Sequence, residues 1–197
     1  MSDYFPYLTV GLLLWGFISS ILSEAGGLFT GSESYIKQIR LPYTLYVYRF
    51  IWSKLIIFAH NIVIYFGVML YFWISPGWVA LLAIPGILVL TLNGTLATLY
   101  IGIVSARFRD IPQLIISFVQ IIFFVTPIMW KPELLKGHSY VAVANPFQHL
   151  IEIVRAPLLG AAPSAADYAV VGAITVMNLA LALIFFTRYR VRISYWI

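Results

Sequence analysis

Five long apolar stretches, nearly free of charged residues, take up about half of this chain of 197 residues. An α-helix needs roughly 20 apolar residues to cross the hydrocarbon core of a bilayer, and each stretch supplies about that number. Hydrophobic residues make up 62% of the chain and charged residues only 10%, whereas a soluble domain carries about 25% charged residues. The sequence therefore predicts an all-α membrane protein and argues against a soluble enzyme. The expected transmembrane helices are residues 5–22, 55–74, 78–104, 113–130 and 168–187.

Two longer connections separate these spans within a single transmembrane domain of residues 1–197. Residues 23–54 are polar and glycine-rich at first, and then carry an amphipathic stretch that ends at Pro42. Residues 131–166 are mixed in character, and we expect them to form two short re-entrant helices on the opposite side of the membrane. Re-entrant segments persist only where protein buries them or where they line a watery cavity.

The basic residues are distributed unequally between the two sides that five spans define, with nine on one side and three on the other. The richer side is cytoplasmic by the positive-inside rule, which places the C-terminus in the cytoplasm and Met1 outside. The net charge of +5 is thus explained by topology and lipid headgroups, without nucleic acid. The nine are Lys37, Arg40, Arg49, Lys54, Arg107, Arg109, Arg188, Arg190 and Arg192, and the three are Lys131, Lys136 and Arg155.

The sequence lacks the usual signatures of an energised or catalytic protein. It contains no G-x-x-x-x-G-K-[ST] phosphate loop and no cysteine, and its three histidines are far apart. A nucleotide site, a thiolate metal site and a cysteine nucleophile are therefore absent from the pattern. If the chain does energised work, the energy must come from a partner.

The segment Ser105-Ala-Arg-Phe-Arg-Asp-Ile-Pro112 is a short charged hairpin on the basic side. Arg107 and Arg109 can bind phosphates, and Asp110 can cap the helix that follows through its backbone N–H groups. The alternative interpretation is a solvated loop that only sets topology and caps a helix.

The segment that begins at Asn145 lies on the other side of the membrane. Asn145 has the character of an N-cap, Pro146 fits the first helical position, and Glu152 and Arg155 can pair at i, i+3 on one helix face. We interpret this segment as one of the re-entrant helices. An interfacial helix with an exposed ion pair is the alternative.

Polar and aromatic side chains inside the spans raise the question of a pathway. Gln113, Ser117 and Gln120 share one face of the fourth span, and Gln120 lies deep enough to need a partner. Asn93 in the third span raises the same need. Aromatic rings that face a pore can stack on sugar rings, whereas packing against protein or lipid is the alternative. The candidate pore-lining residues are Trp15, Gln120, Phe123 and Phe124.

Several segments, taken in order, resemble one known family. They are Lys37-Gln-Ile-Arg-Leu-Pro42, Asn93-Gly-Thr, Ser105-Ala-Arg-Phe-Arg-Asp-Ile-Pro-Gln113, Phe123-Phe-Val-Thr-Pro-Ile-Met-Trp130, Asn145-Pro-Phe and Glu152-Ile-Val-Arg155. The ordered set resembles the membrane subunit of ABC-2 type transporters that export polysaccharides. The nearest resemblance is to O-antigen or lipopolysaccharide permeases, followed by capsule and teichoic acid permeases.

The resemblance implies a mechanism. Two copies of the chain would form a homodimeric channel in the bacterial inner membrane, energised by separate ABC ATPase subunits that bind the ATP. This chain would then need no cofactor of its own, and its partners would be the ATPase, membrane lipid and a lipid-linked glycan such as O-antigen. The residues implied are Tyr35, Lys37 and Arg40 for ATPase coupling in segment 23–54, Arg107, Arg109 and Asp110 at the cytoplasmic mouth, and Asn145, Glu152 and Arg155 at an outer gate.

Members of this family resemble six-span proteins that begin with a cytoplasmic amphipathic helix and a first span. The resemblance therefore implies that this chain runs from the second span to the sixth and is short at its N-terminus. Three other interpretations stay open. They are an ABC-2 exporter of a drug or lipid, a membrane-embedded glycosyl or acyl transferase, and a non-functional fragment.

Overall fold

The computed structural model describes residues 4–39, 41–131 and 144–197. These residues form helices and connecting turns, and no strand occurs among them. Four helical segments are long and apolar enough to cross a membrane, and a fifth is apolar but shorter. The prediction of an all-α membrane protein is confirmed.

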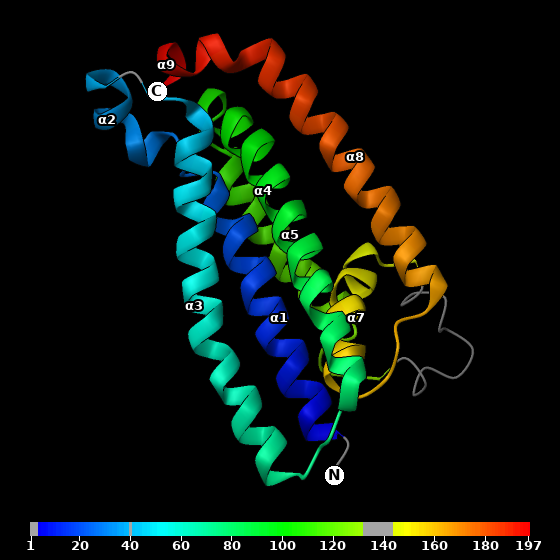
Figure 1. Cartoon of the computed structure of the whole chain (residues 1–197). Coiled ribbons are helices and arrows are strands. Elements are labelled where there is room, and N and C mark those ends of the chain that lie inside the picture. Colours follow the sequence, from blue (N-terminus) through cyan, green and yellow to red (C-terminus); the bar gives the residue numbers. More distant parts are fainter. Residues whose placement is uncertain (1–3, 40, 132–143) are drawn as a thin grey trace.

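The long helices run up and down the molecule in the order of the chain (Figure 1). They are α1 (Tyr4–Ala25), α3 (Tyr43–Tyr71), α4 (Ala83–Arg107), α5 (Ile111–Val125) and α8 (Ala165–Tyr189). A shorter helix lies between α5 and α8 in the chain, α7 (Pro146–Leu158). The small elements are η1 (Thr30–Ser32), α2 (Glu33–Gln38), η2 (Gly77–Leu82), η4 (Arg190–Arg192) and α9 (Ile193–Trp196).

Helix α3 begins at Tyr43, well before the predicted start of the second span at residue 55. Pro42 precedes the helix with φ −59° and ψ 133°, and no glycine or proline interrupts the chain from there until Gly67. Residues 43–54 are therefore the first turns of a continuous helix, although they carry Arg49 and Lys54. A span predicted from hydropathy excludes such charged residues, whereas the helix itself includes them.

Helix α5 ends at Val125, before the predicted end of the fourth span at residue 130. Thr126 has an extended backbone with φ −82° and ψ 133°. It precedes Pro127, and a residue before proline is pushed out of the helical region by the proline ring. Residues Thr126, Pro127 and Ile128 are buried, so this non-helical backbone is enclosed by protein, as a segment at membrane depth requires.

Helix α1 lies at the centre of the bundle and packs against α3, α4, α5 and α7, whereas α8 packs against α4 and α7. One end of the bundle carries α2, α9 and the last turn of α4, and we call it the basic end (Figure 1). The other end carries α7, η2 and the first turn of α1, and we call it the far end. Arg107 and the tail arginines lie at the basic end, and Arg155 lies at the far end.

Two glycines on α4 allow close helix packing. A side chain at Gly102 would meet the Phe29 ring at 3.1 Å, and one at Gly86 would meet the backbone oxygen of Ile153 at 2.6 Å. Small residues let helices approach each other closely in a membrane, where lipid tails compete for every apolar side chain. Gly86 therefore seats α7 directly against α4.

Candidate functional site

The side chain of Arg155 lies inside the far end of the bundle, with 1% of its surface exposed. Its Nη1 donates to the Pro127 carbonyl at 2.9 Å, and its guanidinium lies 4.0 Å from the centroid of the Tyr7 ring. Its Nε and Nη2 donate to Glu152 Oε2 at 3.0 and 2.5 Å, and Nη2 also reaches Gln148 Oε1 at 3.3 Å. A buried charge needs partners that replace water. We call these five residues the Arg155 cluster.

The Arg155 cluster joins three elements that are far apart in the sequence. The predicted pairing of Glu152 with Arg155 is confirmed, but the alternative of an exposed ion pair is wrong, because Arg155 is buried. The Tyr7 hydroxyl also donates to the Pro127 carbonyl at 2.9 Å. The cluster thus ties α7 to the first turns of α1 and to the chain that follows α5.

Asn145 caps α7 and holds the same chain from another direction. Its side-chain oxygen accepts from the Phe147 N–H at 2.9 Å, which confirms the predicted N-cap, with Pro146 at the first helical position. Its Nδ2 donates to Thr126 Oγ1 at 2.9 Å. A cap side chain normally serves only its own helix, so this second bond fixes α7 against the end of α5.

A second buried polar contact joins α7 to α8. His149 Nδ1 lies 2.6 Å from Asp167 Oδ1, and both residues are buried. Asp167 also forms a capping box with Ser164, whose hydroxyl lies 2.6 Å from Asp167 Oδ2 and accepts from the Asp167 N–H. The spacing of Ser164 and Asp167 is a capping-box signature, so this part of the contact is visible in the sequence. No local pattern pairs His149 with Asp167.

Helix α7 is therefore enclosed by protein on several sides. The Tyr65 hydroxyl on α3 donates to the carbonyl of Leu158 at the end of α7, at 2.7 Å. Ile151, Val154 and Arg155 on α7 are each at most 1% exposed. The predicted segment 131–166 is described only in part, because residues 132–143 lie outside the described residues, as do any contacts they make.

The four candidate pore-lining residues occupy different environments. Trp15 is 7% exposed, and the centroid of its ring lies 5.9 Å from the ring centroids of both Phe123 and Phe147. Phe123 is half-buried. Gln120 is exposed and Phe124 is 73% exposed, and both lie on the outward face of α5. Trp15 thus packs against other aromatic rings inside the bundle, whereas Gln120 and Phe124 lie on the surface of the molecule.

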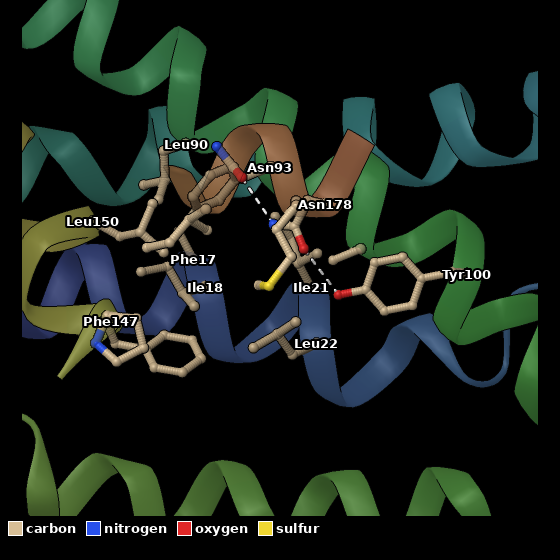
Figure 2. A pocket seen from close by; sticks show the side chains of 15 residues that line it. Phe17, Ile18, Ile21, Leu22, Leu90, Asn93, Tyr100, Phe147, Leu150 and Asn178 are labelled. Carbon is tan, nitrogen blue, oxygen red and sulfur yellow. Dashed lines mark hydrogen bonds between the residues drawn. The ribbon is translucent and has the colours of Figure 1, made fainter. Parts of the chain in front are cut away.

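A polar chain crosses the middle of the bundle between α4 and α8 (Figure 2). The Tyr100 hydroxyl donates to Asn178 Oδ1 at 3.1 Å, and Asn178 Nδ2 donates to Asn93 Oδ1 at 2.8 Å. Asn93 Nδ2 donates in turn to Thr175 Oγ1 at 2.8 Å. The partner that Asn93 was expected to need is therefore on α8.

Three residues of this polar chain, Asn93, Tyr100 and Asn178, border a cavity of about 210 Å³ between α1, α4, α7 and α8 (Figure 2). Apart from Asn93, Asn178 and Tyr100, the lining is apolar, with Phe17, Ile18, Ile21, Leu22, Leu90, Phe147 and Leu150 among its residues. Because the amides and the phenol bond to one another, the cavity presents mainly hydrocarbon.

Two of the residues predicted to couple to an ATPase, Tyr35 and Lys37, lie on α2 at the basic end. Tyr35 is 56% exposed, and Lys37 Nζ lies 2.6 Å from Glu33 Oε1. This hydrogen bond and the charge of Lys37 lower the pKa of the Glu33 carboxyl, with a smaller contribution from Arg109. Arg40 lies outside the described residues. Arg109, which lies between α4 and α5, therefore contributes to the pKa of a carboxyl on α2 that is distant in the chain.

The predicted helix cap at Asp110 is wrong. Asp110 precedes α5, but its side chain accepts no cap hydrogen bond from the described backbone. Its own backbone is already helical, with φ −86° and ψ −18°, whereas a capping side chain normally starts from an extended backbone. Arg107 and Arg109 are exposed, which the phosphate-binding and the solvated-loop interpretations both expect, and Arg107 stacks over the rings of Phe108 and Trp196.

The chain as a whole matches one protein family. The sequence profile of the ABC-2 type transporter family matches residues 1–159, which include α1 to α7. No curated protein matches the chain at a significant level. The apolar helices described above are those of a multi-pass membrane protein. The chain belongs to the ABC-2 type transporter family, whose members are membrane transport subunits.

Proposed function

We propose that this chain is the permease subunit of an ABC exporter that moves a lipid-linked polysaccharide, with O-antigen the first candidate. Two copies form the channel in a bacterial inner membrane, and a separate ATPase subunit supplies the energy. ABC-2 permeases normally pair with such an ATPase. The observation that carries this proposal is the outward face of α5.

This face is a stripe of four exposed residues along α5, beside a second exposed stripe that is apolar (Leu114, Phe118 and Ile121). The four are Gln113, Ser117, Gln120 and Phe124. The Ser117 hydroxyl bonds back to the Gln113 carbonyl at 3.1 Å, whereas the Gln120 amide has no hydrogen bond to any described residue. An unpaired amide in hydrocarbon costs several kcal/mol, roughly 4–8 on a cyclohexane scale. We infer that this face meets water or a second copy rather than lipid tails.

The length of α5 supports the same placement. Its 15 residues span about 22 Å, at a rise of roughly 1.5 Å per residue, whereas the hydrocarbon core is about 30 Å thick. A helix of this length suits a position between protein and water better than one surrounded by lipid. Two copies of the α5 face, set opposite each other, would form a path with amide, hydroxyl and aromatic walls, which suits repeated weak contacts with sugars.

The two ends of the bundle take the roles expected of a cytoplasmic and an outer side. The basic end is cytoplasmic by the positive-inside rule, so α2 with Tyr35, Lys37 and the adjoining Arg40 meets the ATPase. Arg107, Arg109 and Asp110 form the cytoplasmic mouth, where the cations attract the pyrophosphate of the lipid-linked glycan.

At the far end, Asn145, Glu152 and Arg155 form the outer gate together with α7. Their hydrogen bonds hold α7 against the chain that follows α5, so opening there requires α7 and the end of α5 to move as one unit. Trp15, Phe123 and Phe147 pack just inside this region, where a moving gate would expose aromatic faces to a glycan.

A second candidate is an ABC-2 exporter of a drug or lipid. The specific observation in its favour is the apolar cavity of about 210 Å³ between α1, α4, α7 and α8. A hydrophobic solute fits such walls, whereas a hydrated sugar does not. The cavity lies away from the α5 face, so the two candidates make different predictions for changes in α5.

The two candidates are separated by transport into inverted membrane vesicles that contain the chain and the ATPase with which it purifies. Uptake of a fluorescent lipid-linked glycan is compared with uptake of a fluorescent hydrophobic amine and of a short-chain lipid. The polysaccharide proposal predicts ATP-dependent glycan uptake that falls about tenfold or more in Gln120→Leu, from lost polar lining, and is retained in Gln120→Asn. Uptake of the amine or lipid without the glycan favours the second candidate.

A further inference from the structure

The lysines and the arginines at the basic end differ in their partners. Lys37 pairs with Glu33, and Lys54, which is 6% exposed, pairs with Glu24 across α3 and α1. Several arginines at this end are exposed and form no ion pair with any described acidic residue, which leaves an uncompensated positive surface. They are Arg107, Arg188, Arg190 and Arg192.

Two of these arginines share one aromatic platform. The rings of Tyr189 and Trp196 lie 5.7 Å apart, centroid to centroid. The guanidinium of Arg107 lies 5.3 Å from the centroid of the Trp196 ring, and that of Arg188 lies 5.9 Å from the centroid of Tyr189. Stacking uses the flat face of a guanidinium and leaves its N–H edge free to form two parallel bonds to a phosphate. The platform thus holds one guanidinium against each of its two rings.

The tail that carries this platform is fixed to the bundle. Ile193 is fully buried and Ile197 is 8% exposed, whereas Val191 is 81% and Tyr195 is 87% exposed. Figure 1 shows η4 and α9 running from the end of α8 across the top of the bundle toward α2. An apolar side chain and a tyrosine that point outward among arginines are typical of a segment at the membrane–water boundary.

An apolar face continues from this platform down α8. Leu183 and Ile184 are 55% and 57% exposed, and they lie about one turn below Arg188 on the helix. Helix α8 packs against α4 and α7 with its other side. In a bilayer, the outward face of α8 therefore meets acyl chains directly beneath the arginines.

We propose that this platform is a binding site for an anionic phospholipid of the surrounding bilayer. The phosphate accepts from the guanidinium groups of Arg107 and Arg188, Arg190 and Arg192 add attraction for its charge, and an acyl chain lies along Leu183 and Ile184. The continuous cation-then-hydrocarbon surface favours a lipid over an acidic protein surface, which would match the arginines but not the face below them. The site shares Arg107 with the proposed cytoplasmic mouth and in that part rests on the proposed function, whereas Arg188 belongs to the lipid site alone.

The test uses the purified chain in lipid nanodiscs, with native mass spectrometry to count bound phosphatidylglycerol against phosphatidylcholine. A cation near an anionic surface contributes about 1 kcal/mol, or about fivefold in affinity. Arg188→Gln should therefore weaken retention of phosphatidylglycerol about fivefold, and Arg107→Gln with Arg188→Gln about 25-fold. The matched control is Arg49→Gln, which removes one exposed arginine from the same end but from no aromatic platform, and it should change retention less than about twofold.

Two results of that comparison overturn the proposal. Unchanged phosphatidylglycerol retention in the double variant removes the arginines from the site, and an equal loss in Arg49→Gln reduces the effect to net charge. If a lipid-linked pyrophosphate displaces phosphatidylglycerol completely at equal concentration, the platform is a substrate site instead.

A second measurement reports on the tail without removing any arginine. Because the sequence contains no cysteine, Tyr195→Cys carries a single spin label, whose depth is read from its accessibility to oxygen and to a water-soluble relaxant. The proposal predicts a label at headgroup depth that moves deeper with added phosphatidylglycerol. A label in water that becomes protected only when an ATPase subunit is added assigns the surface to a protein partner and overturns the lipid site.

Discussion

Arg155 donates a hydrogen bond of 2.9 Å from Nη1 to the backbone carbonyl of Pro127, 28 residues earlier in the chain. Pro127 also stops α5 after Val125, because its ring pushes Thr126 out of the helical region, so the helix break and the buried cation are parts of one arrangement. A buried carbonyl outside a helix needs a donor, and the Arg155 guanidinium and the Tyr7 hydroxyl supply it. The chain after α5 and the helix α7 are therefore coupled through a charged group.

This coupling predicts unequal effects at the two ends of the ion pair. Glu152→Ala leaves the guanidinium of Arg155 buried without its carboxylate and should lower the free energy of unfolding by about 3–5 kcal/mol. Arg155→Met removes the buried charge, and Glu152, with 27% of its side chain exposed, can turn to water. That variant should lose about 1–2 kcal/mol, mainly from one lost hydrogen bond to the Pro127 carbonyl, which still accepts from the Tyr7 hydroxyl.

Titration with a denaturing detergent, followed by circular dichroism, measures both variants of this pair. The exposed Arg109→Gln is the control and should change stability by less than about 0.5 kcal/mol. Equal losses for Glu152→Ala and Arg155→Met would show that desolvation of the cation does not govern the cluster.

The contact between His149 and Asp167 predicts a measurable coupling between α7 and α8. In a double-mutant cycle, the free energy of unfolding is measured for His149→Phe, Asp167→Asn and the double variant. The sum of the two single losses should exceed the loss of the double variant by about 1–2 kcal/mol. The same cycle with Ser164→Ala in place of His149→Phe separates the capping box from the link between helices. Simple additivity of His149→Phe and Asp167→Asn would mean that the 2.6 Å contact does not stabilise the fold.

The polar chain between α4 and α8 predicts that one change is worse than two. Asn178→Leu removes the side chain that bonds both the Asn93 oxygen and the Tyr100 hydroxyl. It should lower the free energy of unfolding by about 1 kcal/mol. Adding Asn93→Leu removes the orphaned amide, and the pair of changes should recover part of that loss. Unfolding in detergent checks this order. A double variant less stable than Asn178→Leu alone would contradict it.

The pKa of Glu33 predicts how α2 responds to pH. Lys37 lowers this pKa below its ordinary value, which is about 4.3 for an unperturbed glutamate. The contribution of the pair to α2 is therefore fully present above that value and is lost as the pH falls through the lowered pKa. The hydrogen-exchange rate of α2, divided by the intrinsic rate at the same pH, should rise as the pH falls from neutral to about pH 3. Glu33→Gln should remove that extra change, and its persistence would assign it to another group.

The sequence was sufficient for the class of the protein and for the positions of most helices. The apolar runs predict α1, α4 and α8 closely, because burial in lipid requires continuous hydrophobic helix. The run before α3 was misplaced because Arg49 and Lys54 lower its hydropathy, while Lys54 in fact turns inward to Glu24. The end of α5 precedes the predicted residue 130 because Pro127 pushes Thr126 out of the helical region, an effect that hydropathy does not register.

The contacts of the far end could be predicted only where they are local. The spacing of Glu152 and Arg155 indicates a pair, and Asn145 before Pro146 indicates a cap. The bonds from Arg155 to Pro127 and from His149 to Asp167 join residues that only the folded bundle brings together, so no pattern in one sequence contains them. The same holds for Asn93, because the sequence indicates that its buried amide needs a hydrogen-bond partner but does not identify Asn178 as that partner.

The central claim is that the outward face of α5 lines a path between two copies of the chain. Because the sequence has no cysteine, single cysteines can be placed at Gln113, Ser117, Gln120 and Phe124, with Val119 on the buried side as the control. The measurement is labelling in membrane vesicles by a charged, water-soluble maleimide, together with disulfide cross-linking between copies. The account predicts labelling and cross-linking at the four outward positions and neither at Val119. Labelling of Gln120→Cys only by a lipid-soluble reagent, without cross-links, would place this face in hydrocarbon and contradict the account.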